Sequence, residues 1–255
     1  MQRPPVITHT IPLPHCRERT EPVKFIIIHC SLGTPEKQLK TLDELGLSTH
    51  YIIGKDGTIT SIIPPTKVAY HAGLSRWNNS EGTSLNGSSI GIELETQTLG
   101  QSPDDFPLAL RKSLKSILQD LVIKYKIRKE NILGHSDVSP TRKPDPGKCF
   151  PWRELYKHNF NVWYNLHCLS KETDEVKLLQ TIGYDTSDLP AARYAFCRHY
   201  MPEEVFVESD IQKLLDNPYP KDFSPKNQYL YHRILRGVAY KYTETRQQRV
   251  WFLEK

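Results

Sequence analysis

The sequence predicts an α/β fold, in which a central mixed β-sheet is flanked by helices and followed by a small all-helical C-terminal domain. Residues 25–30 form a continuous apolar run (FIIIHC), which is typical of a strand buried on both faces. Residues 107–126 repeat apolar side chains at helical spacing. After Trp163 the strand patterns end and helical patterns follow. Strands mixed with helices favour a sheet packed by helices.

Three further strands are predicted. Residues 51–53 and 58–63 flank the turn Gly54-Lys55-Asp56-Gly57, which indicates a hairpin. Residues 89–95 alternate, with Ile90, Ile92 and Leu94 on one face and Glu93 on the other. Residues 131–134 form a short strand.

Helices are predicted at 107–126, with Asp104 or Asp105 as the N-cap, and more weakly at 35–45. The C-terminal pattern predicts helices at about 172–182, 190–199, 209–215 and 227–242. We therefore expect two domains, at 20–165 and 172–255, with the boundary near 165–172. The aromatic residues Tyr194, Phe196 and Tyr200 are expected in the core of the second domain.

The composition excludes several classes of protein. The five cysteines are widely spaced without a CxxC pair, so neither a disulfide framework nor a zinc–thiolate site is expected. The net charge of +5 suits an acidic partner, but no basic run predicts nucleic-acid binding. No apolar run approaches the roughly 18 residues that span a bilayer, and no signal peptide is visible. The protein is thus either cytosolic or shown without its export signal.

One loop, residues 134–147, carries a histidine, a lysine and an aspartate (His135, Lys143 and Asp145) between three prolines that limit its flexibility. His29 ends the buried strand at 25–30, where α/β folds commonly place ligand-binding groups. An isolated histidine there is more often a core residue bonded to a backbone carbonyl. Together with His135 and Asp145, however, it supplies three ligands for a catalytic zinc ion with one position left for water.

Glu93 and Lys143 also have two interpretations each. Glu93 is either a solvated strand carboxylate or, near a metal site, a general base. Lys143 is either a surface lysine or a cation that stabilises an oxyanion beside Asp145.

Six motifs in a fixed order now point to a known family. They are FIII before His29, STHY before the KDG turn, YHAG (70–73), LN (85–86), SIGIE (89–93), and GHSDVSPTRKPDPG (134–147) followed by FPW. This order resembles the zinc-dependent N-acetylmuramoyl-L-alanine amidases of the type 2 amidase family, which are related to phage T7 lysozyme and the peptidoglycan recognition proteins. The resemblance covers roughly residues 20–160.

The resemblance implies a role for each matching residue. His29, His135 and Asp145 would bind zinc, Glu93 would be the catalytic acid/base, and Lys143 would support the transition state. The substrate groove would be lined by His50, His71 and Asn86. The C-terminal part is similar to the helical peptidoglycan-binding-like domain of two-domain members. One departure is Lys148-Cys149, which places a cation near the site where many relatives have a proline and an apolar residue.

We therefore expect a zinc hydrolase that cleaves the amide between N-acetylmuramic acid and L-alanine in peptidoglycan or muropeptides. The alternative is a peptidoglycan recognition protein without catalytic activity. We expect a monomer without a transmembrane segment, located in the cell envelope or periplasm if an export signal is absent from this sequence, and otherwise in the cytoplasm.

Overall fold

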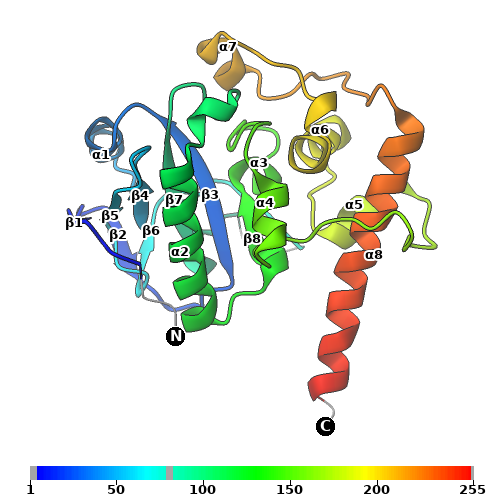
Figure 1. Cartoon of the computed structure of the whole chain (residues 1–255), viewed down its shortest axis with the longest axis horizontal. Helices are drawn as coiled ribbons and strands as arrows, with labels where there is room; N and C mark the ends of the chain where they lie inside the picture. Colours follow the sequence, from blue (N-terminus) through cyan, green and yellow to red (C-terminus); the bar gives the residue numbers. More distant parts are fainter. Residues whose placement is uncertain (1–4, 79–82, 254–255) are drawn as a thin grey trace.

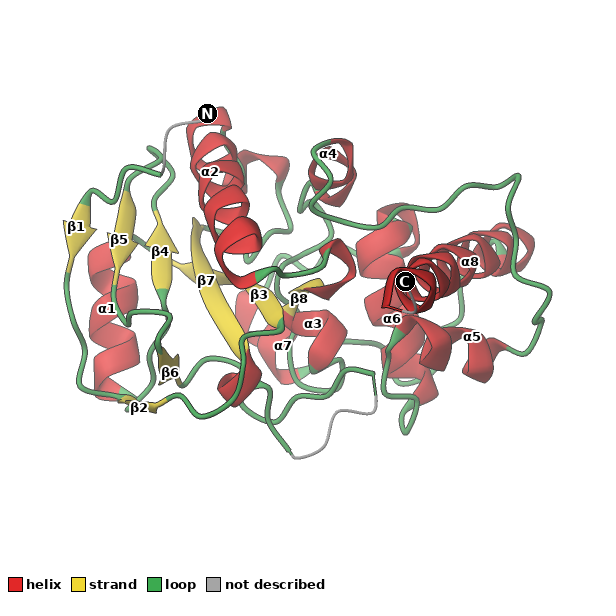
Figure 2. Ribbon diagram, turned by 90° about the horizontal axis from the view of Figure 1, so that it is seen from below, coloured by secondary structure: helices red, strands yellow, loops and turns green. Residues whose placement is uncertain are grey.

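The computed structural model describes residues 5–78 and 83–253. Its centre is a six-stranded sheet in the order β1-β5-β4-β7-β3-β8, and β2 and β6 form a separate two-stranded sheet (Figures 1 and 2). The strands are β1 (His9–Thr10), β2 (Cys16–Glu18), β3 (Phe25–Leu32), β4 (Tyr51–Ile53), β5 (Ile59–Ser61), β6 (Lys67–Ala69), β7 (Ser89–Thr96) and β8 (Ile132–Gly134).

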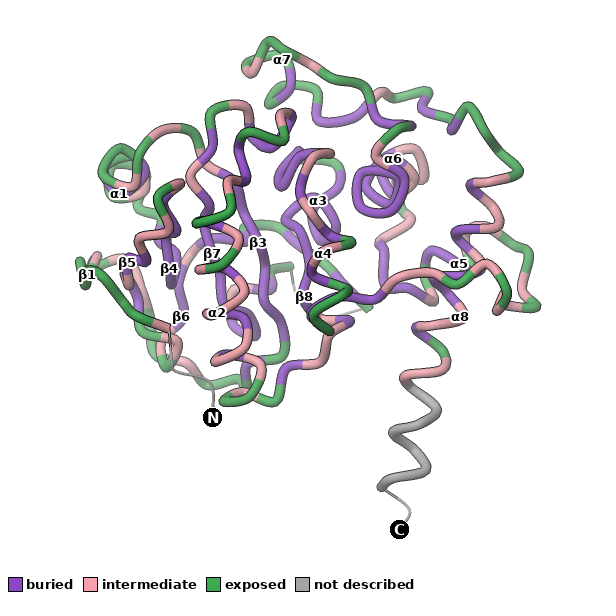
Figure 3. Tube along the Cα trace, in the orientation of Figure 1, coloured by how far each residue is buried: buried purple, intermediate pink, exposed green. Residues whose placement is uncertain are grey.

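The sheet is mixed, as predicted. β3 lies between β7 and the edge strand β8 and is parallel to both. β4 is parallel to β7 but antiparallel to β5, and this pair is the predicted hairpin. Both β3 and β7 are buried along most of their length (Figure 3).

Helices cover both faces of the sheet. They are α1 (Pro35–Glu44), α2 (Leu108–Tyr125), α3 (His135–Val138), α4 (Trp152–Lys157), α5 (Glu175–Ile182), α6 (Leu189–Tyr200), α7 (Ile211–Asp216) and α8 (Gln228–Leu253). No helix among the described residues is both long and apolar enough to cross a bilayer.

The side chains of β4 show which helix covers which face. Ile53 packs in one cluster with Leu110 and Leu114 of α2, whereas Ile52 packs with Leu39 of α1. Since neighbouring side chains of a strand point to opposite faces, α1 and α2 lie on opposite sides of the sheet.

Helices α5, α6 and α8 of the C-terminal unit, which we define as residues 172–253, lie beyond the β8 edge of the sheet, whereas α7 reaches back toward the carboxyl end of β3 (Figures 1 and 2). This unit shares one hydrophobic cluster with the N-terminal part: Ile27 of β3 and Leu133 of β8 belong to the same cluster as Leu178 and Phe196. The aromatic residues expected in the core, Tyr194, Phe196 and Tyr200, are all buried.

The division into domains at 20–165 and 172–255 stays a prediction, and residues 254–255 lie outside the described part.

Three details differ from expectation. Pro107 is the N-cap of α2 and makes no side-chain cap, while Asp105 accepts backbone bonds from Gln97 and Gly100 instead. β3 continues to Leu32, so His29 lies inside the strand rather than at its end. α8 extends well beyond the predicted end at 242. Five short elements, β1, β2, β6, α3 and α4, were not predicted.

Candidate active site

The register of β3 and β7 places two of the expected site residues side by side. His29 is the direct partner of Glu93 across this parallel pair. Their neighbours Ile28 and Ile92 belong to the cluster that packs against α2, so His29 and Glu93 point to the opposite face. His135 is the first residue of α3, immediately after β8, the other neighbour of β3.

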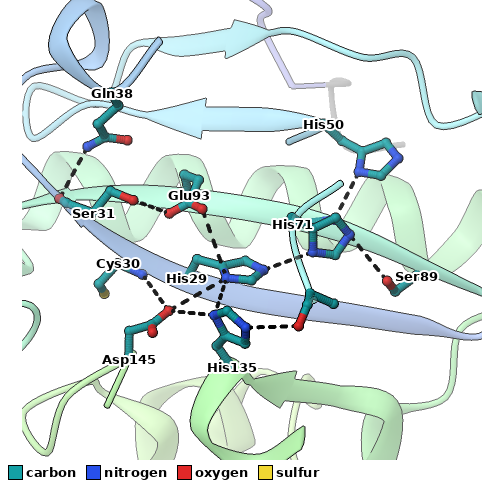
Figure 4. A network of polar contacts seen from close by, with 12 residues as sticks. His29, Cys30, Ser31, Gln38, His50, His71, Ser89, Glu93, His135 and Asp145 are labelled. Carbon is teal, nitrogen blue, oxygen red and sulfur yellow. Dashed lines mark hydrogen bonds and ion pairs between the residues drawn. The ribbon is translucent and has the colours of Figure 1, made fainter. Parts of the chain in front are cut away.

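Three potential ligand atoms converge at this point (Figure 4). The Nδ1 atoms of His29 and His135 lie 2.9 Å apart. The Oδ2 atom of Asp145 is 3.5 Å from Nδ1 of His29 and 3.2 Å from Nδ1 of His135. All three residues are buried, and His29 comes 106 residues before His135 in the sequence.

The hydrogen-bond partner of His135 determines which of its ring nitrogens carries the proton. Its Nε2 atom lies 3.2 Å from the carbonyl oxygen of Ala72. A carbonyl accepts hydrogen bonds but cannot donate them, so Nε2 carries the proton of the neutral ring. The lone pair of Nδ1 therefore points toward His29 and Asp145.

A longer chain of hydrogen bonds fixes His29 in the same tautomer, with its proton on Nε2. The hydroxyl of Ser89 donates to the carbonyl of Leu85, so its oxygen accepts a hydrogen bond from the Nε2–H of His71, 3.2 Å away. Nδ1 of His71 is then an acceptor, and it lies 2.9 Å from Nε2 of His29. His29 thus holds its proton on Nε2 and leaves the Nδ1 lone pair free. We call this chain the His71–Ser89 relay.

This arrangement fits a metal ion. Ligands at about 2.0–2.1 Å from a tetrahedral ion lie about 3.3 Å from one another, and the three separations here bracket that value. Each imidazole also donates the N–H of its Nε2 atom to a fixed partner, as ligating histidines do. The three donors therefore form a group that can hold a metal.

Electrostatics favour the deprotonated ligand set. Burial opposes the charged form of Asp145, but the adjacent His135 and His29 rings outweigh it and hold the pKa of this carboxyl well below its usual range. Burial, reinforced by the neighbouring His135, lowers the pKa of His29. The carboxylate is thus ionised while the His29 ring stays neutral, which is the state that binds a cation.

Glu93 is buried beside this group and has two different oxygen environments. Its Oε2 atom accepts a bond of 2.6 Å from the Ser31 hydroxyl, and its Oε1 atom lies 3.9 Å from Nδ1 of His29. Burial raises the pKa of Glu93. Ser31 was not singled out from the sequence, although it follows His29 on the same face of β3.

A groove of about 420 Å³ opens over these residues. Its lining includes Glu93, Lys143 and His71, and its wall includes Leu45 and Leu215. Leu215 belongs to α7, so the C-terminal unit contributes to the groove. No pattern in the sequence indicated this contact, because Leu215 lies far from the family motifs.

The three residues expected to line the groove have different surroundings. His71 lies at the groove, where it also contacts His29. Asn86 accepts the backbone N–H groups of His71 and Ala72 with its side-chain oxygen. His50 is fully buried and accepts the N–H of Gly91 on β7. Contact of these residues with substrate stays a prediction, and the structure shows Asn86 and His50 supporting the segments around His71.

Lys148, the residue that departs from the family pattern, does not point into the groove. Its ammonium group donates to the carbonyl of Val205 in the C-terminal unit. The expectation that it adds a cation to the site is therefore not supported. Its contact joins the end of the 134–147 loop, which we call the catalytic loop for its proposed role, to the C-terminal unit.

Comparison with known families decides the identity of the fold. Residues 19–148 match the family model described as N-acetylmuramoyl-L-alanine amidase, Amidase_2. The chain belongs to this family. The matched range contains all five residues expected to bind the metal or to act in catalysis: His29, Glu93, His135, Lys143 and Asp145.

Individual relatives agree with this assignment. The amidase is 29% identical to N-acetylmuramoyl-L-alanine amidase AmiD of Escherichia coli K12, over 74% of this chain and 79% of that protein. It is 31% identical to 1,6-anhydro-N-acetylmuramyl-L-alanine amidase AmpD of Enterobacter cloacae, over 57% of this chain and 87% of that protein.

Solved structures show the same fold. The structure of Escherichia coli AmiD, in complex with anhydro-N-acetylmuramic acid-L-Ala-D-γ-Glu-L-Lys, aligns with a TM-score of 0.67 at 24% identity. The alignment covers 90% of this chain and 92% of that one, so it includes the C-terminal unit. The protein is an N-acetylmuramoyl-L-alanine amidase, and the comparisons give no support to a recognition protein without activity.

Proposed function

We propose that this amidase holds a zinc ion with His29, His135 and Asp145 and hydrolyses the amide between N-acetylmuramic acid and L-alanine with Glu93 as acid/base. The observation that carries this proposal is the convergence of two imidazole lone pairs and one carboxylate oxygen beside a buried glutamate. Two nitrogen donors and one oxygen donor are a typical catalytic zinc set, with a coordination position left open. Zinc supplies a Lewis acid and lowers the pKa of water toward 7.

Glu93 is suited to accept a proton from the attacking water. Its Oε2 atom is held by Ser31, so Oε1 is the oxygen that faces the ligand group. The raised pKa brings this carboxyl closer to the working pH, which favours proton transfer in both directions. Glu93 would take the proton as water attacks and return it to the departing alanine nitrogen.

Lys143 shares the groove with Glu93 and with the ligands. A fixed cation stabilises negative charge that develops on the carbonyl oxygen during attack, and it does so more strongly in a site with little water. We assign Lys143 to this role, and its position two residues before Asp145 supports the assignment because both lie on the same short loop.

The proposed substrates are muropeptides and peptidoglycan strands. The AmpD relatives, by their names, act on 1,6-anhydro-N-acetylmuramyl-L-alanine, which makes anhydromuropeptides the first substrates to test. The apolar wall formed by Leu45 and Leu215 would contact uncharged parts of the substrate, whereas Lys143 and His71 provide the polar contacts. Envelope location and a monomeric state stay predictions.

The decisive experiment uses Glu93→Gln, which keeps the size and the Ser31 bond of the side chain but cannot accept a proton. We expect the rate of muropeptide cleavage to fall at least about 100-fold while one zinc ion per chain remains bound. Product masses should show the free stem peptide for the wild type, and a chelator should abolish this activity. Near-normal activity of Glu93→Gln with zinc bound would overturn the role of Glu93.

A further inference from the structure

A buried carboxylate, Asp137, lies two residues after the proposed ligand His135 and binds the C-terminal unit. Its Oδ2 atom accepts the backbone N–H of Gly134 at 2.7 Å and the Nδ1–H of His199 at 2.9 Å. Its Oδ1 atom accepts the hydroxyl of Tyr184 at 2.8 Å. Asp137, Tyr184 and His199 are all buried.

We propose that the C-terminal unit holds the metal-binding loop in position through Asp137, so that Tyr184 and His199 are positioning residues for the amidase reaction. This inference rests on the proposed function, because it requires His135 to be a metal ligand. It assigns the C-terminal unit a part in catalysis in addition to any contact with the cell wall.

The bonds of Asp137 constrain His135 directly. Gly134, whose N–H binds Asp137, ends β8, and His135 follows it as the first residue of α3. The same carboxylate therefore closes the turn that aims His135 at His29. A side chain added at Gly134 would meet Pro146 at 2.7 Å, so the turn is also packed against the loop that carries Asp145.

His199 is itself held in one orientation. Its ring is stacked between Trp152, with centroids 3.9 Å apart, and Tyr200, with centroids 4.2 Å apart. Its Nε2 atom lies 3.0 Å from the amide nitrogen of Asn161, which can only donate. Nδ1 must then carry the proton, and its hydrogen bond to Asp137 is a fixed one.

Tyr184 is equally constrained. Its ring packs edge-on against Trp77 with centroids 4.8 Å apart. Burial and the nearby Asp137 raise the pKa of Tyr184 well above its usual range, so the phenol keeps its proton and acts as a donor. Two rigid donors of the C-terminal unit thus meet one carboxylate of the catalytic loop.

Two further contacts of this unit lie around the same loop. Lys148, just after the loop, donates to the carbonyl of Val205, and Leu215 lines the groove beside the proposed ligands. The C-terminal unit therefore contacts the catalytic loop near its start and at its end, as expected if the unit supports the geometry of the site.

The test compares two substitutions that each remove one buried phenol hydroxyl of the C-terminal unit. Tyr184→Phe removes the bond to Asp137, whereas Tyr231→Phe removes a 2.7 Å bond to Glu175, away from the catalytic loop. Both are made in the full-length zinc enzyme. Competition with a chromophoric chelator measures the zinc affinity. Assays with a muropeptide give kcat and KM, and urea unfolding gives the stability.

We expect Tyr184→Phe to lower the zinc affinity about tenfold and kcat about tenfold, while KM changes less than twofold. Tyr231→Phe should leave both within twofold at a comparable loss of stability. In an Asp137→Asn background the effect of Tyr184→Phe should shrink, because both changes act through the same side chain at position 137. His199→Gln serves as a second variant with the same expected direction if Tyr184→Phe does not fold.

Equal effects of Tyr184→Phe and Tyr231→Phe on zinc affinity, or additive effects of Tyr184→Phe and Asp137→Asn, would overturn the positioning role. Failure of the proposed function looks different, since the wild type itself would then bind no zinc or cleave no muropeptide. That result would remove this inference together with the proposed function.

Discussion

A single serine hydroxyl sets the proton positions on one side of the site. Ser89 donates to Leu85 and accepts from His71, and this decides which nitrogen of His29 has a free lone pair. Residues of this kind tune metal ligands from a distance, and their loss typically weakens metal binding by about 10–100-fold.

Ser89→Ala is therefore expected to lower zinc affinity by about tenfold, because His71 loses the acceptor that fixes its tautomer. Competition with a chelator measures this change. Ser113→Ala is a matched control, since the Ser113 hydroxyl also donates to a carbonyl, that of Gly57, but lies outside the site. If both variants bind zinc as the wild type does, the His71–Ser89 relay does not determine the state of His29.

His50 predicts a specific dependence of stability on pH. Burial is the main cause that lowers its pKa to about 3, whereas the same side chain in the unfolded state has a pKa of about 6.5. Between these values the unfolded state binds one more proton than the folded state. Stability is therefore complete above about pH 6.5 and falls as the pH drops toward 3, by about 1.4 kcal/mol per pH unit from this residue.

We expect His50→Gln to flatten the acid side of the stability profile by this amount. Urea unfolding of wild type and variant at pH 7, 5.5 and 4.5 gives the two profiles, and their difference isolates His50 from the other histidines. Two parallel profiles would show that His50 is not kept neutral by the fold.

The residues that converge at the candidate site were predictable from the sequence, whereas the residues that support them were not. His29, Glu93, His135 and Asp145 stand in motifs whose order is specific, and the structure brings them together. Ser89 also stands in the SIGIE motif, but no role was predicted for it, because its function depends on which histidine packs against it. Tertiary contacts of this kind follow from the register of the sheet and cannot be derived from local patterns.

At the scale of elements, Gly91 on β7 makes room for the site. A Cβ atom at this position would lie 2.5 Å from Cγ of His71, closer than side chains tolerate. β7 can thus pass directly behind His71 only because residue 91 has no side chain.

Gly91→Ala should therefore displace the His71 ring and weaken zinc binding by about tenfold, along with a loss of stability. Chelator competition and urea unfolding measure the two effects. Gly46→Ala is a useful control: φ of +67° makes the substitution strained, but no atom lies within 4 Å of the added carbon. If Gly91→Ala loses stability but binds zinc normally, the ring has a second acceptable position.

Long elements were predicted better than short ones. The core strands and α2 have eight or more residues of regular pattern, which outweigh local exceptions. β1 has two residues and α3 has four, so neither is long enough to repeat its pattern. The cap of α2 was predicted wrongly because Asp105 binds the backbone of residues 97–100, a competing use of the same carboxylate.

At the scale of the whole molecule, the amidase fold and the C-terminal unit are joined by apolar packing as well as by Asp137. Ile27 and Leu133, on the sheet, share a cluster with Leu178 and Phe196 of the C-terminal unit. Sequence patterns locate a change of architecture after Trp163 but do not show that the two parts bury a common core, because each helix pattern indicates an apolar face without indicating its partner.

A shared core predicts that both parts unfold together. Leu133 is 1% exposed and belongs to β8, so Leu133→Ala should cost about 2–5 kcal/mol through lost contacts and a cavity. If the core is common, tryptophan fluorescence and far-UV circular dichroism should report one thermal unfolding transition in the wild type. In the variant both signals should shift together to the same lower temperature. A transition that splits in Leu133→Ala, with the helical signal lost at the wild-type temperature, would show instead that the C-terminal unit is stable without the sheet.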